Sequence, residues 1–116
     1  MKESAIQRQI LDLLAAKGIL AFRQNTGAMS GSYKGKKWFM RFGVPGMADI
    51  LAFQKRPSND VYCHKEADRI TPMWIECKAP KGKQSELQKS FQAQVEVHGH
   101  RYIVAHDVDD VIEALR

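Results

Sequence analysis

The sequence contains no apolar run long enough to cross a membrane, and it has only two cysteines among its 116 residues. A membrane-spanning helix needs about 20 consecutive apolar residues, and the N-terminal segment has no apolar signal-peptide core. Two cysteines are too few for the disulfide framework of a small secreted domain. We therefore expect a soluble, cytoplasmic protein with reduced thiols and no membrane partner.

The chain also has no internal repeat and no low-complexity segment that would separate two domains. Its residues are 44% hydrophobic, which is enough for one modest core, so we expect a single domain over residues 1–116. Lys and Arg outnumber Asp and Glu by 18 to 13, which gives a formal net charge of +5. This excess favours a polyanionic partner such as nucleic acid, although many ordinary domains share it.

Two short motifs place acidic side chains at the ends of predicted strands. Residues 43–49 (GVPGMAD) end in Asp49, and residues 75–78 (IECK) contain Glu76 and Lys78. Residues i and i+2 of a strand point to the same face, so this strand would present a carboxylate and an ammonium group side by side. Its other face is apolar and is expected to pack against helices; it comprises Met73, Ile75 and Cys77.

Paired carboxylates of this kind are typical of a magnesium site. Mg²⁺ prefers carboxylate oxygen and is commonly held by one or two carboxylates together with substrate phosphate, and Asp49 and Glu76 can supply that pair. The ion would activate a water and neutralise charge on a scissile phosphate, while Lys78 would position the attacking water. The alternative is an exposed Glu76–Lys78 ion pair, which is common on strand faces and contributes at most about 1 kcal/mol.

Further segments extend the pattern beyond the acidic motifs. They are residues 41–52 (RFGVPGMADILA), 75–78 (IECK), 85–88 (SELQ) and 25–27 (NTG), together with Glu3 and the helix predicted after it. Taken together, they resemble the virus-type replication-repair nuclease (VRR-NUC) family, a branch of the PD-(D/E)XK nuclease superfamily, over nearly the whole chain. One departure is Ala48, which precedes Asp49 where the superfamily pattern has proline; Pro45 lies just upstream.

The resemblance implies a fold and a set of site residues. The fold is a restriction-endonuclease-like α/β core, a mixed β-sheet flanked by helices in the order α-β-β-β-α-β. The implied cofactor is Mg²⁺ or Mn²⁺, held by Glu3, Asp49, Glu76 and the backbone carbonyl of Cys77. The implied catalytic residues are Asp49, Glu76, Lys78, which orients the nucleophile, and Gln88, which supports the site.

Glu3 has two competing interpretations. It precedes an apolar stripe at helical spacing, so it would fall on the inward face of a helix, where a metal or a metal-bound water would satisfy the carboxylate. Alternatively, residues 4–7 (SAIQ) form a capping box, and Glu3 is a favourable charge just outside the helix N-terminus. The apolar stripe consists of Ile6, Ile10, Leu13 and Leu14.

Gln88 is equally ambiguous, because residues 85–88 also have the capping-box pattern. Leu87, Phe91 and Val95 indicate the buried side of the helix that follows. A structural cap therefore explains Gln88 without an active site, and only the family resemblance makes it an active-site contact.

Basic residues gather in two clusters that would flank the proposed metal. Such side chains contact phosphates and carry little base information, although a solvated face is the default explanation for any single lysine. Trp38 and Phe39 would stack on an unpaired base, but we favour a core position for one of the two. The predicted DNA-binding residues are Lys34, Lys36, Lys37 and Arg41, which bracket the Gly/Ser-rich residues 27–32, and Lys81, Lys83 and Lys89, around the loop after residue 78.

Periodicity and turn residues predict the elements that carry these motifs. We expect helices over residues 4–17 and 85–98, the first stopped by Gly18, and a last helix capped by Asp107. A mobile basic loop is expected between residues 23 and 36. The predicted strands cover residues 19–23, 36–42, 49–54, 71–78 and 101–105.

Cysteine and histidine do not form a second metal motif. None of the candidates has the paired spacing that is typical of zinc ligands, and residues 98–100 (HGH) instead predict a helix end with Gly99 in the left-handed cap position. The candidates are Cys63, His64, Cys77, His98 and His100.

These inferences lead to one hypothesis: a Mg²⁺- or Mn²⁺-dependent endonuclease that hydrolyses the DNA backbone. Stand-alone family members resemble Holliday-junction resolvases, which implies a homodimer selective for branched DNA such as four-way junctions, acting in recombination or repair. The resemblance also implies a phage or prophage gene expressed in a bacterial host. The alternatives are a non-catalytic nucleic-acid-binding module on the same fold and a sequence-preferring nicking or restriction-type nuclease.

Overall fold

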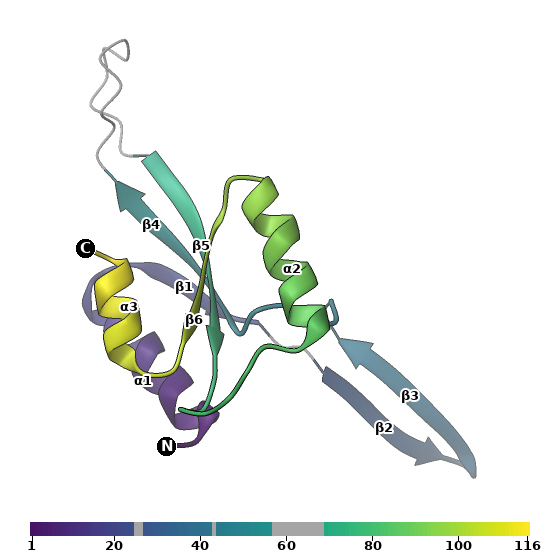
Figure 1. Cartoon of the computed structure of the whole chain (residues 1–116). Helices are drawn as coiled ribbons and strands as arrows, with labels where there is room; N and C mark the ends of the chain where they lie inside the picture. The colour runs from purple at the N-terminus through teal and green to yellow at the C-terminus, as the bar shows by residue number, and fades with distance from the viewer. Residues whose placement is uncertain (25–26, 43, 57–68) are drawn as a thin grey trace.

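A four-stranded mixed β-sheet forms the centre of the protein (Figure 1). The computed structural model describes residues 1–24, 27–42, 44–56 and 69–116. The strand order is β1-β4-β5-β6; β4 pairs antiparallel with β1 and β5, whereas β5 and β6 are parallel. Helices lie on both faces, which confirms the expected α/β class with a mixed, helix-flanked sheet. The strands are β1 (Leu20–Arg23), β4 (Ile50–Arg56), β5 (Arg69–Cys77) and β6 (Arg101–Ala105).

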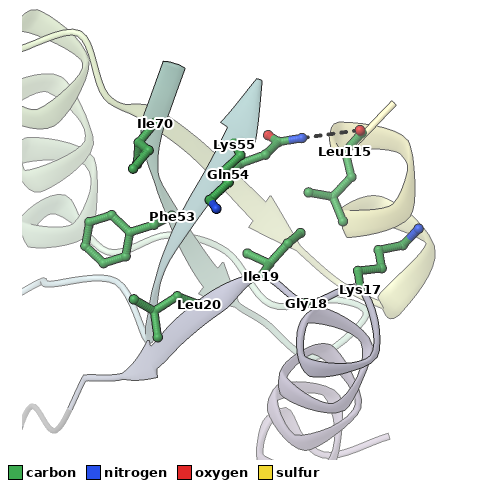
Figure 2. Close-up of a pocket in the computed structure, with 9 residues that line it drawn as sticks. All are labelled: Lys17, Gly18, Ile19, Leu20, Phe53, Gln54, Lys55, Ile70 and Leu115. Atoms are coloured by element: carbon green, nitrogen blue, oxygen red, sulfur yellow. Dashed lines mark hydrogen bonds between the residues drawn. The ribbon is translucent and has the colours of Figure 1, made fainter. Parts of the chain in front are cut away.

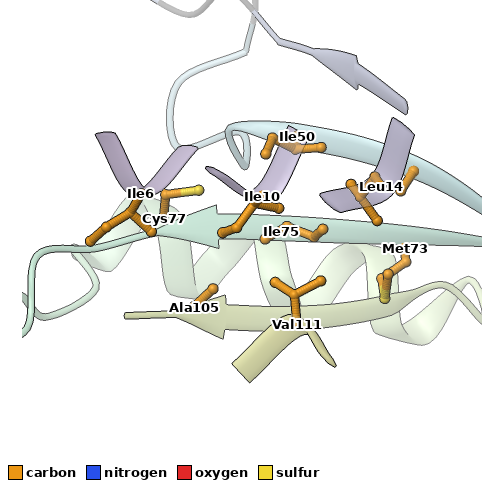
Figure 3. Packing of buried hydrophobic residues seen from close by; sticks show 10 residues of the cluster. Ile6, Ile10, Leu14, Ile50, Met73, Ile75, Cys77, Ala105 and Val111 are labelled. Carbon is orange, nitrogen blue, oxygen red and sulfur yellow. The ribbon is translucent and has the colours of Figure 1, made fainter. Parts of the chain in front are cut away.

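The hydrophobic core lies on the face of the sheet covered by α1 (Glu3–Ala16) and α3 (Val108–Ala114) (Figure 3). Met73, Ile75 and Cys77 of β5 point to this side and are at most 1% exposed. The alternation predicted for this strand is therefore confirmed. Each fully buried aliphatic side chain contributes roughly 1.5–3 kcal/mol, so this layer holds β5 in place. Its partners are Ile6, Ile10 and Leu14 of α1, Ile50 and Ala52 of β4, Ala105 of β6 and Val111 of α3.

The opposite face carries α2 (Glu86–Val97), which connects the parallel strands β5 and β6. Phe91 is the buried side chain of α2 and meets Trp74 of β5 edge to face, with ring centroids 5.0 Å apart. Leu87 is 59% exposed, so the expectation that it lies on the buried side of this helix is wrong. Leu87 lies in the first turn of α2, where another segment of the chain contacts the backbone of the helix and not the Leu87 side chain.

Most predicted helix ends are confirmed. Gly18 and Gly99 follow α1 and α2 with φ of 70° and 83°, a left-handed conformation that glycine adopts without strain. The Asp107 side chain accepts a hydrogen bond from the Asp110 backbone N–H at the start of α3. The predicted capping box at residues 4–7 is wrong, because α1 already begins at Glu3 and its N-cap is Lys2, which makes no side-chain cap bond.

The segment expected to be a mobile loop instead contains the strand β2 (Gly27–Tyr33), which pairs antiparallel with β3 (Lys36–Phe42) in a two-stranded ribbon. Lys34 and Gly35 form the turn with φ of 50° and 77°, as a two-residue hairpin loop of type I′ requires. The expected strand over residues 36–42 is confirmed. Glycine and serine suggested a loop, but a glycine in a strand can be covered by a cross-strand aromatic ring.

Trp38 supplies that ring, because it lies opposite Gly31 in the ribbon. A Cβ atom at Gly31 would be 2.6 Å from Trp38 Cζ2, so the indole rests directly on the glycine backbone. Trp38 is nevertheless 41% exposed and Phe39 63% exposed. The preferred core position for one of these two aromatics is therefore wrong, since the ribbon projects away from the sheet (Figure 1).

Several sequence predictions concern residues outside the described ranges, namely residues 25–26 of the family resemblance, Gly43, Cys63 and His64. In chain order the described elements are α1, β1, β2, β3, β4, β5, α2, β6 and α3, and the β2–β3 ribbon is inserted between two strands of the main sheet. Within the described ranges, no helix has the length and apolar character needed to cross a membrane.

Candidate active site

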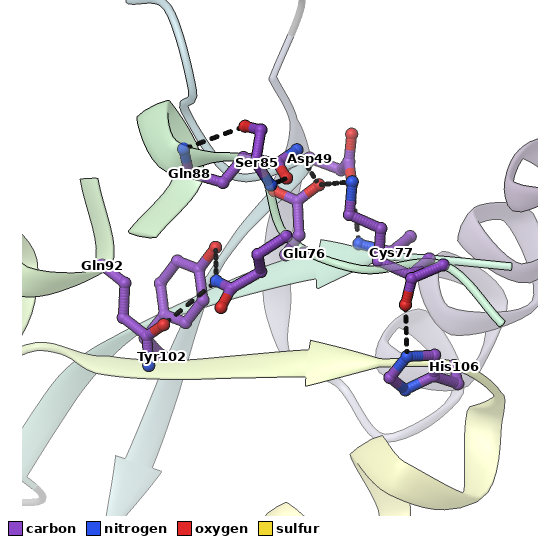
Figure 4. A network of polar contacts seen from close by, with 11 residues as sticks. Asp49, Glu76, Cys77, Ser85, Gln88, Gln92, Tyr102 and His106 are labelled. Atoms are coloured by element: carbon purple, nitrogen blue, oxygen red, sulfur yellow. Dashed lines mark hydrogen bonds and ion pairs between the residues drawn. The ribbon is translucent and has the colours of Figure 1, made fainter. Parts of the chain in front are cut away.

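Asp49 and Glu76 come together because of the register between β4 and β5. The antiparallel pairing aligns Ile50 with Ile75, so the next position outward sets Asp49 against Glu76. Side chains directly opposite in an antiparallel pair have Cβ atoms about 4.5–5.5 Å apart. Two motifs separated by 27 positions in the sequence thereby place both carboxylates at one end of the sheet (Figure 4).

Glu76 is a buried acid with an incomplete set of hydrogen bonds. The residue is 2% exposed, and its Oε1 accepts a hydrogen bond of 2.8 Å from Gln88 Nε2. The other oxygen, Oε2, is buried without a hydrogen-bond partner among the described residues. A buried carboxylate oxygen without a partner is costly, and a bound cation is one way to satisfy it.

Burial and, after it, the negative charge of Asp49 raise the pKa of Glu76 from its ordinary value of 4.5 to about 8, while Lys78 opposes the shift. Two adjacent carboxylates at a buried position resist simultaneous ionisation. Without a cation, the pair therefore retains a proton near neutral pH. A divalent ion would compensate both negative charges and displace that proton.

Asp49 is fixed by the backbone around it. Its Oδ2 accepts a hydrogen bond of 2.7 Å from the Cys77 backbone N–H, and its carbonyl accepts one of 2.7 Å from the Gln24 N–H. The first bond ties the residue before β4 to the end of β5, just beyond the Ile50–Ile75 pair. Asp49 therefore cannot turn away from Glu76 without breaking the strand junction.

Gln88 both caps α2 and contacts the buried Glu76 carboxylate. The capping box is present, because Ser85 Oγ accepts from the Gln88 backbone N–H at 3.2 Å and Gln88 Oε1 accepts from the Ser85 N–H at 2.8 Å. Since the side-chain carbonyl faces a backbone N–H, the amide nitrogen must point the other way, toward Glu76 Oε1. The cap of α2 thus orients a donor onto the buried carboxylate.

Lys78 lies on the same strand edge as Glu76, as the alternation predicts. Its Nζ is 3.8 Å from Glu76 Oε1, and its side chain is only 12% exposed. The exposed Glu76–Lys78 surface pair is therefore not what the structure shows, because both partners are largely buried. The Lys78 backbone N–H donates to the Ala105 carbonyl at 2.9 Å, which continues the pairing with β6 past the end of β5.

Glu3 lies at the first turn of α1 and is exposed, so the expectation that its side chain turns inward is wrong. Its charge still contributes to the raised pKa of Glu76 and of Cys77, which places it within electrostatic reach of the site. Among the described residues, no three His, Cys, Asp or Glu side chains are grouped closely enough to hold a metal ion. A ligand role of Glu3, directly or through a metal-bound water, stays a prediction.

Cys77 presents its side chain to the core and its backbone to the site. The thiol is buried, and burial together with the nearby acids raises its pKa to about 12, so it stays protonated. A neutral buried thiol is unreactive. Its backbone N–H is occupied by Asp49, and a ligand role of its backbone carbonyl stays a prediction.

Gly46 allows the loop before Asp49 to approach the start of α2. Its φ is 82°, and a Cβ atom there would overlap the carbonyl group of Leu87. This backbone contact explains why the first turn of α2, with Ser85 and Gln88, lies beside the acidic pair. No local sequence signal specified the contact, because the two segments are about 40 positions apart.

Gly46→Ala is expected to lower the free energy of unfolding by about 3 kcal/mol, since alanine adds left-handed strain of roughly 1–2 kcal/mol and an overlap with the α2 backbone. Gly99→Ala is the matched control, because Gly99 has nearly the same φ, 83°, but nothing lies within 4 Å of its added Cβ. Urea denaturation of both variants measures the difference. Equal losses would mean that the Gly46–Leu87 contact can relax at no cost.

The loop between β5 and α2 carries part of the second basic cluster and is anchored at two points (Figure 4). His106 contacts the Gly82 carbonyl through Nε2 at 3.2 Å, and Gln84 Nε2 donates to the Tyr102 hydroxyl at 3.2 Å and to Gln92 Oε1 at 3.0 Å. Sequence reasoning missed these anchors, whose partners are 8 to 24 positions apart. The exposed lysines of this cluster are Lys81, Lys83 and Lys89, the last paired with Glu86 at 3.4 Å.

The first basic cluster is not at the acidic pair but on the β2–β3 ribbon. Lys34, Lys36 and Lys37 are exposed, and Lys34 Nζ lies 5.4 Å from the centre of the Tyr33 ring. Arg41 pairs with Ala28 near the base of the ribbon. The ribbon leads directly into the loop that ends at Asp49, so the cluster and the acids are connected through a short stretch of chain.

A pocket of about 700 Å³ lies at the opposite end of the sheet from the acidic pair (Figure 2). It includes none of the predicted site residues, so its size alone does not make it the active site. Its lining is apolar with two lysines and consists of Lys17, Gly18, Ile19, Leu20, Phe53, Gln54, Lys55, Ile70 and Leu115.

Comparisons with protein-family models, with curated proteins and with solved structures give no match to this chain. The chemistry of the site is therefore inferred from its own residues and their arrangement.

Proposed function

We propose that this protein is a divalent-metal-dependent DNA endonuclease of the VRR-NUC type, within the PD-(D/E)XK superfamily. The observation that carries the proposal is the buried Glu76 carboxylate, which faces the Asp49 carboxylate, has one oxygen oriented by Gln88 and has no hydrogen-bond donor to the other among the described residues. A structural ion pair would satisfy both oxygens. Hard oxygen ligands of this kind suit Mg²⁺ or Mn²⁺ better than softer metals.

The residues present fit such an ion. Asp49 and Glu76 would hold it, and a bound divalent ion supplies an activated water and compensates charge on the scissile phosphate. Lys78, with its Nζ near Glu76, would donate a hydrogen bond to the attacking water or to a phosphate oxygen. Gln88 keeps the Glu76 carboxylate in one orientation, and pre-organisation of this kind lowers the cost of reaching the transition state.

The arrangement of elements supports the same assignment. If the β2–β3 ribbon is treated as an insertion, the chain runs α1, β1, β4, β5, α2, β6 and α3, which is compatible with the α-β-β-β-α-β order of the restriction-endonuclease-like fold followed by one further helix. The acids lie at the start of β4 and the end of β5, and the glutamine lies on the helix that follows. Glu3 at the first turn of α1 would act through its charge or through a metal-bound water.

For the substrate, we propose branched DNA, with four-way junctions first. No recognition module accompanies the site in the described part of the chain, so DNA shape would be read more than base sequence. A four-way junction has symmetry-related strands, and a C2 homodimer would present one site to each of two strands.

Cleavage of a labelled four-way junction in Mg²⁺ or Mn²⁺ is expected, with none in a chelator and weaker cutting of linear duplex. Asp49→Asn should lower the cleavage rate by about 10³-fold, because one of two metal carboxylates is lost. Asp12→Asn, on the exposed side of α1, is the control and should cleave normally.

Other outcomes separate the alternatives. Tight DNA binding without cleavage in any divalent metal would favour a non-catalytic binding module. Cutting at fixed base sequences on every junction arm would favour a nicking or restriction-type nuclease. Equal cutting of linear duplex would remove the junction preference, and a monomer in light scattering that resolves junctions symmetrically would contradict the homodimer.

A further inference from the structure

The basic charge of this protein is concentrated in one part of the chain. Residues 13–48 contain six Lys or Arg and no Asp or Glu, so the remaining residues have twelve basic against thirteen acidic side chains. The net charge of +5 thus originates in the segment that contains β1 and the β2–β3 ribbon. Four of the six cations lie on the ribbon or at its turn: Lys34, Lys36, Lys37 and Arg41.

The outer half of the ribbon exposes aromatic rings as well as lysines. Tyr33 is 68% exposed, Phe39 63% and Trp38 41%. Exposed aromatics near a hairpin tip do not contribute to a core, and a two-stranded ribbon by itself is only marginally stable in water. Clustered exposed aromatic residues mark a surface that binds a partner.

Rings and ammonium groups alternate on the same faces of the ribbon. Tyr33 lies directly opposite Lys36, and Trp38 is two positions further along β3, so all three share one face. The Trp38 ring rests on Gly31, which holds one side of the indole against the backbone and leaves the other side outward. A flat ring held beside a lysine can accept a base on its face and a phosphate on the neighbouring cation.

We propose that the β2–β3 ribbon is an arm that binds a single-stranded segment of DNA next to the candidate active site. Trp38 stacks on an unpaired base, Lys36 contacts a phosphate on the same face, and Lys37, which points to the other face of β3, contacts a phosphate around the edge of the ribbon. The choice of DNA rests on the proposed nuclease function. Unpaired bases are favoured over duplex because only unpaired bases offer their faces to aromatic rings, whereas a duplex would use the lysines alone.

The position of the arm fits this role. Seven residues at about 3.4 Å each give β2 a length of roughly 24 Å, enough for several nucleotides. The ribbon is followed by the loop in which Gly46 contacts the first turn of α2, where Gln88 contacts Glu76. A strand lying along the ribbon would therefore lead toward the acidic pair, as the unpaired region at a branch or flap would require.

The test measures binding without cleavage, by fluorescence anisotropy of labelled oligodeoxythymidylate and of a blunt duplex in a chelator. Trp38→Ala should weaken binding of the single strand by about 10-fold or more and leave duplex binding almost unchanged. Trp38→Phe should restore most of the affinity. The oligonucleotide should quench the tryptophan emission of the wild type but not that of Trp38→Phe. The tryptophan that this variant retains is Trp74, which is packed between Phe91 and His100.

The lysines are tested by the salt dependence of the same binding. Lys36→Ala/Lys37→Ala should lower the slope of log affinity against log salt by about 1.4, or 0.7 for each phosphate contact on a single strand. Lys17→Ala/Lys55→Ala removes the same charge at the pocket on the other end of the sheet and should leave the slope unchanged.

Three results would contradict the proposal that the ribbon is a DNA-binding arm. One is wild-type single-strand binding by both Trp38→Ala and Lys36→Ala/Lys37→Ala. A second is an equal loss of single-strand and duplex binding in Trp38→Ala. The third is a defect of the ribbon variants in sedimentation with phosphatidylserine vesicles but not in DNA binding, which would assign the ribbon to anionic membranes.

The experiments distinguish failure of the proposed DNA-binding arm from failure of the proposed nuclease function. Ribbon variants with wild-type cleavage of junctions and flaps and wild-type single-strand binding would leave the nuclease intact without the arm. Ribbon-dependent binding by a protein that cleaves nothing in Mg²⁺ or Mn²⁺ would leave the arm intact without the nuclease.

Discussion

Glu76→Gln is expected to abolish DNA cleavage and at the same time to stabilise the metal-free protein. Cleavage should fall by about 10³-fold or more, because the amide removes the buried negative charge that would hold the divalent ion. Stability in a chelator should rise, because a buried carboxylate with an unpaired oxygen beside Asp49 is replaced by a neutral group of the same shape. A Tm increase of several degrees at pH 8 is the expected size.

Glu86→Gln is the matched control. Glu86 lies in the first turn of α2, its side chain is 91% exposed, and its ion pair with Lys89 is at 3.4 Å. Such a pair contributes about 0.2–0.5 kcal/mol, so this variant should keep its cleavage rate and nearly its Tm. Cleavage and calorimetry on the two variants measure both effects together.

Opposite changes in activity and stability separate a functional from a structural role of Glu76. A structural acid that holds α2 through Gln88 would give a variant that loses both properties. Wild-type cleavage by Glu76→Gln would show that the metal site was assigned to the wrong residues, whatever its stability.

Elements and faces that depend on local periodicity were predictable from the sequence. Strand β5 shows this best, because alternation alone separated Ile75 and Cys77, which are in the core, from Glu76 and Lys78. Once the strands were recognised, the pairing of Asp49 with Glu76 needed only an antiparallel register. The approach of these two motifs was therefore expected, although its chemistry awaits experiment.

Details that depend on long-range backbone contacts were not predictable in the same way. The N-cap of α1 is Lys2, whereas the capping pattern suggested Ser4, and Glu3 is exposed in the first helical turn. Leu87 seemed apolar enough for the core, but the first turn of α2 is held by the backbone contact with Gly46. Neither effect leaves a pattern in the neighbouring residues.

The ribbon shows how composition can mislead. Glycine and serine in residues 27–32 are typical of loops, yet Gly31 is the position on which the Trp38 ring rests. The signal was present as a two-residue turn at Lys34–Gly35 between segments of similar length. It was outweighed by the low hydrophobicity of β2, because residues 30–39, the part of the ribbon whose side chains the structure describes, are not in the core and impose no apolar alternation.

The stability of the protein should depend on pH in a way that reports on the acidic pair. The pKa of Glu76 in the folded protein is about 8, above its ordinary value of 4.5, so the folded state retains a proton that the unfolded chain releases. Stability from this group is complete below about pH 4.5 and is lost as the pH rises toward 8. In a chelator, Tm should fall by about 10 °C across this interval, beyond the change seen in Glu76→Gln.

Divalent metal should reverse that loss. An ion bound between Asp49 and Glu76 takes the place of the proton, and its affinity rises with pH because the carboxyl must be ionised to bind it. The gain in Tm on adding 10 mM Mg²⁺ or 1 mM Mn²⁺, concentrations chosen as roughly saturating for a weak site, should therefore be small at pH 5 and largest above pH 8. Glu76→Gln should show little gain at any pH. If the curves of Tm against pH with and without metal run parallel in the wild type, no ion binds at this pair. Proton and metal compete for one site only if they share the same oxygens.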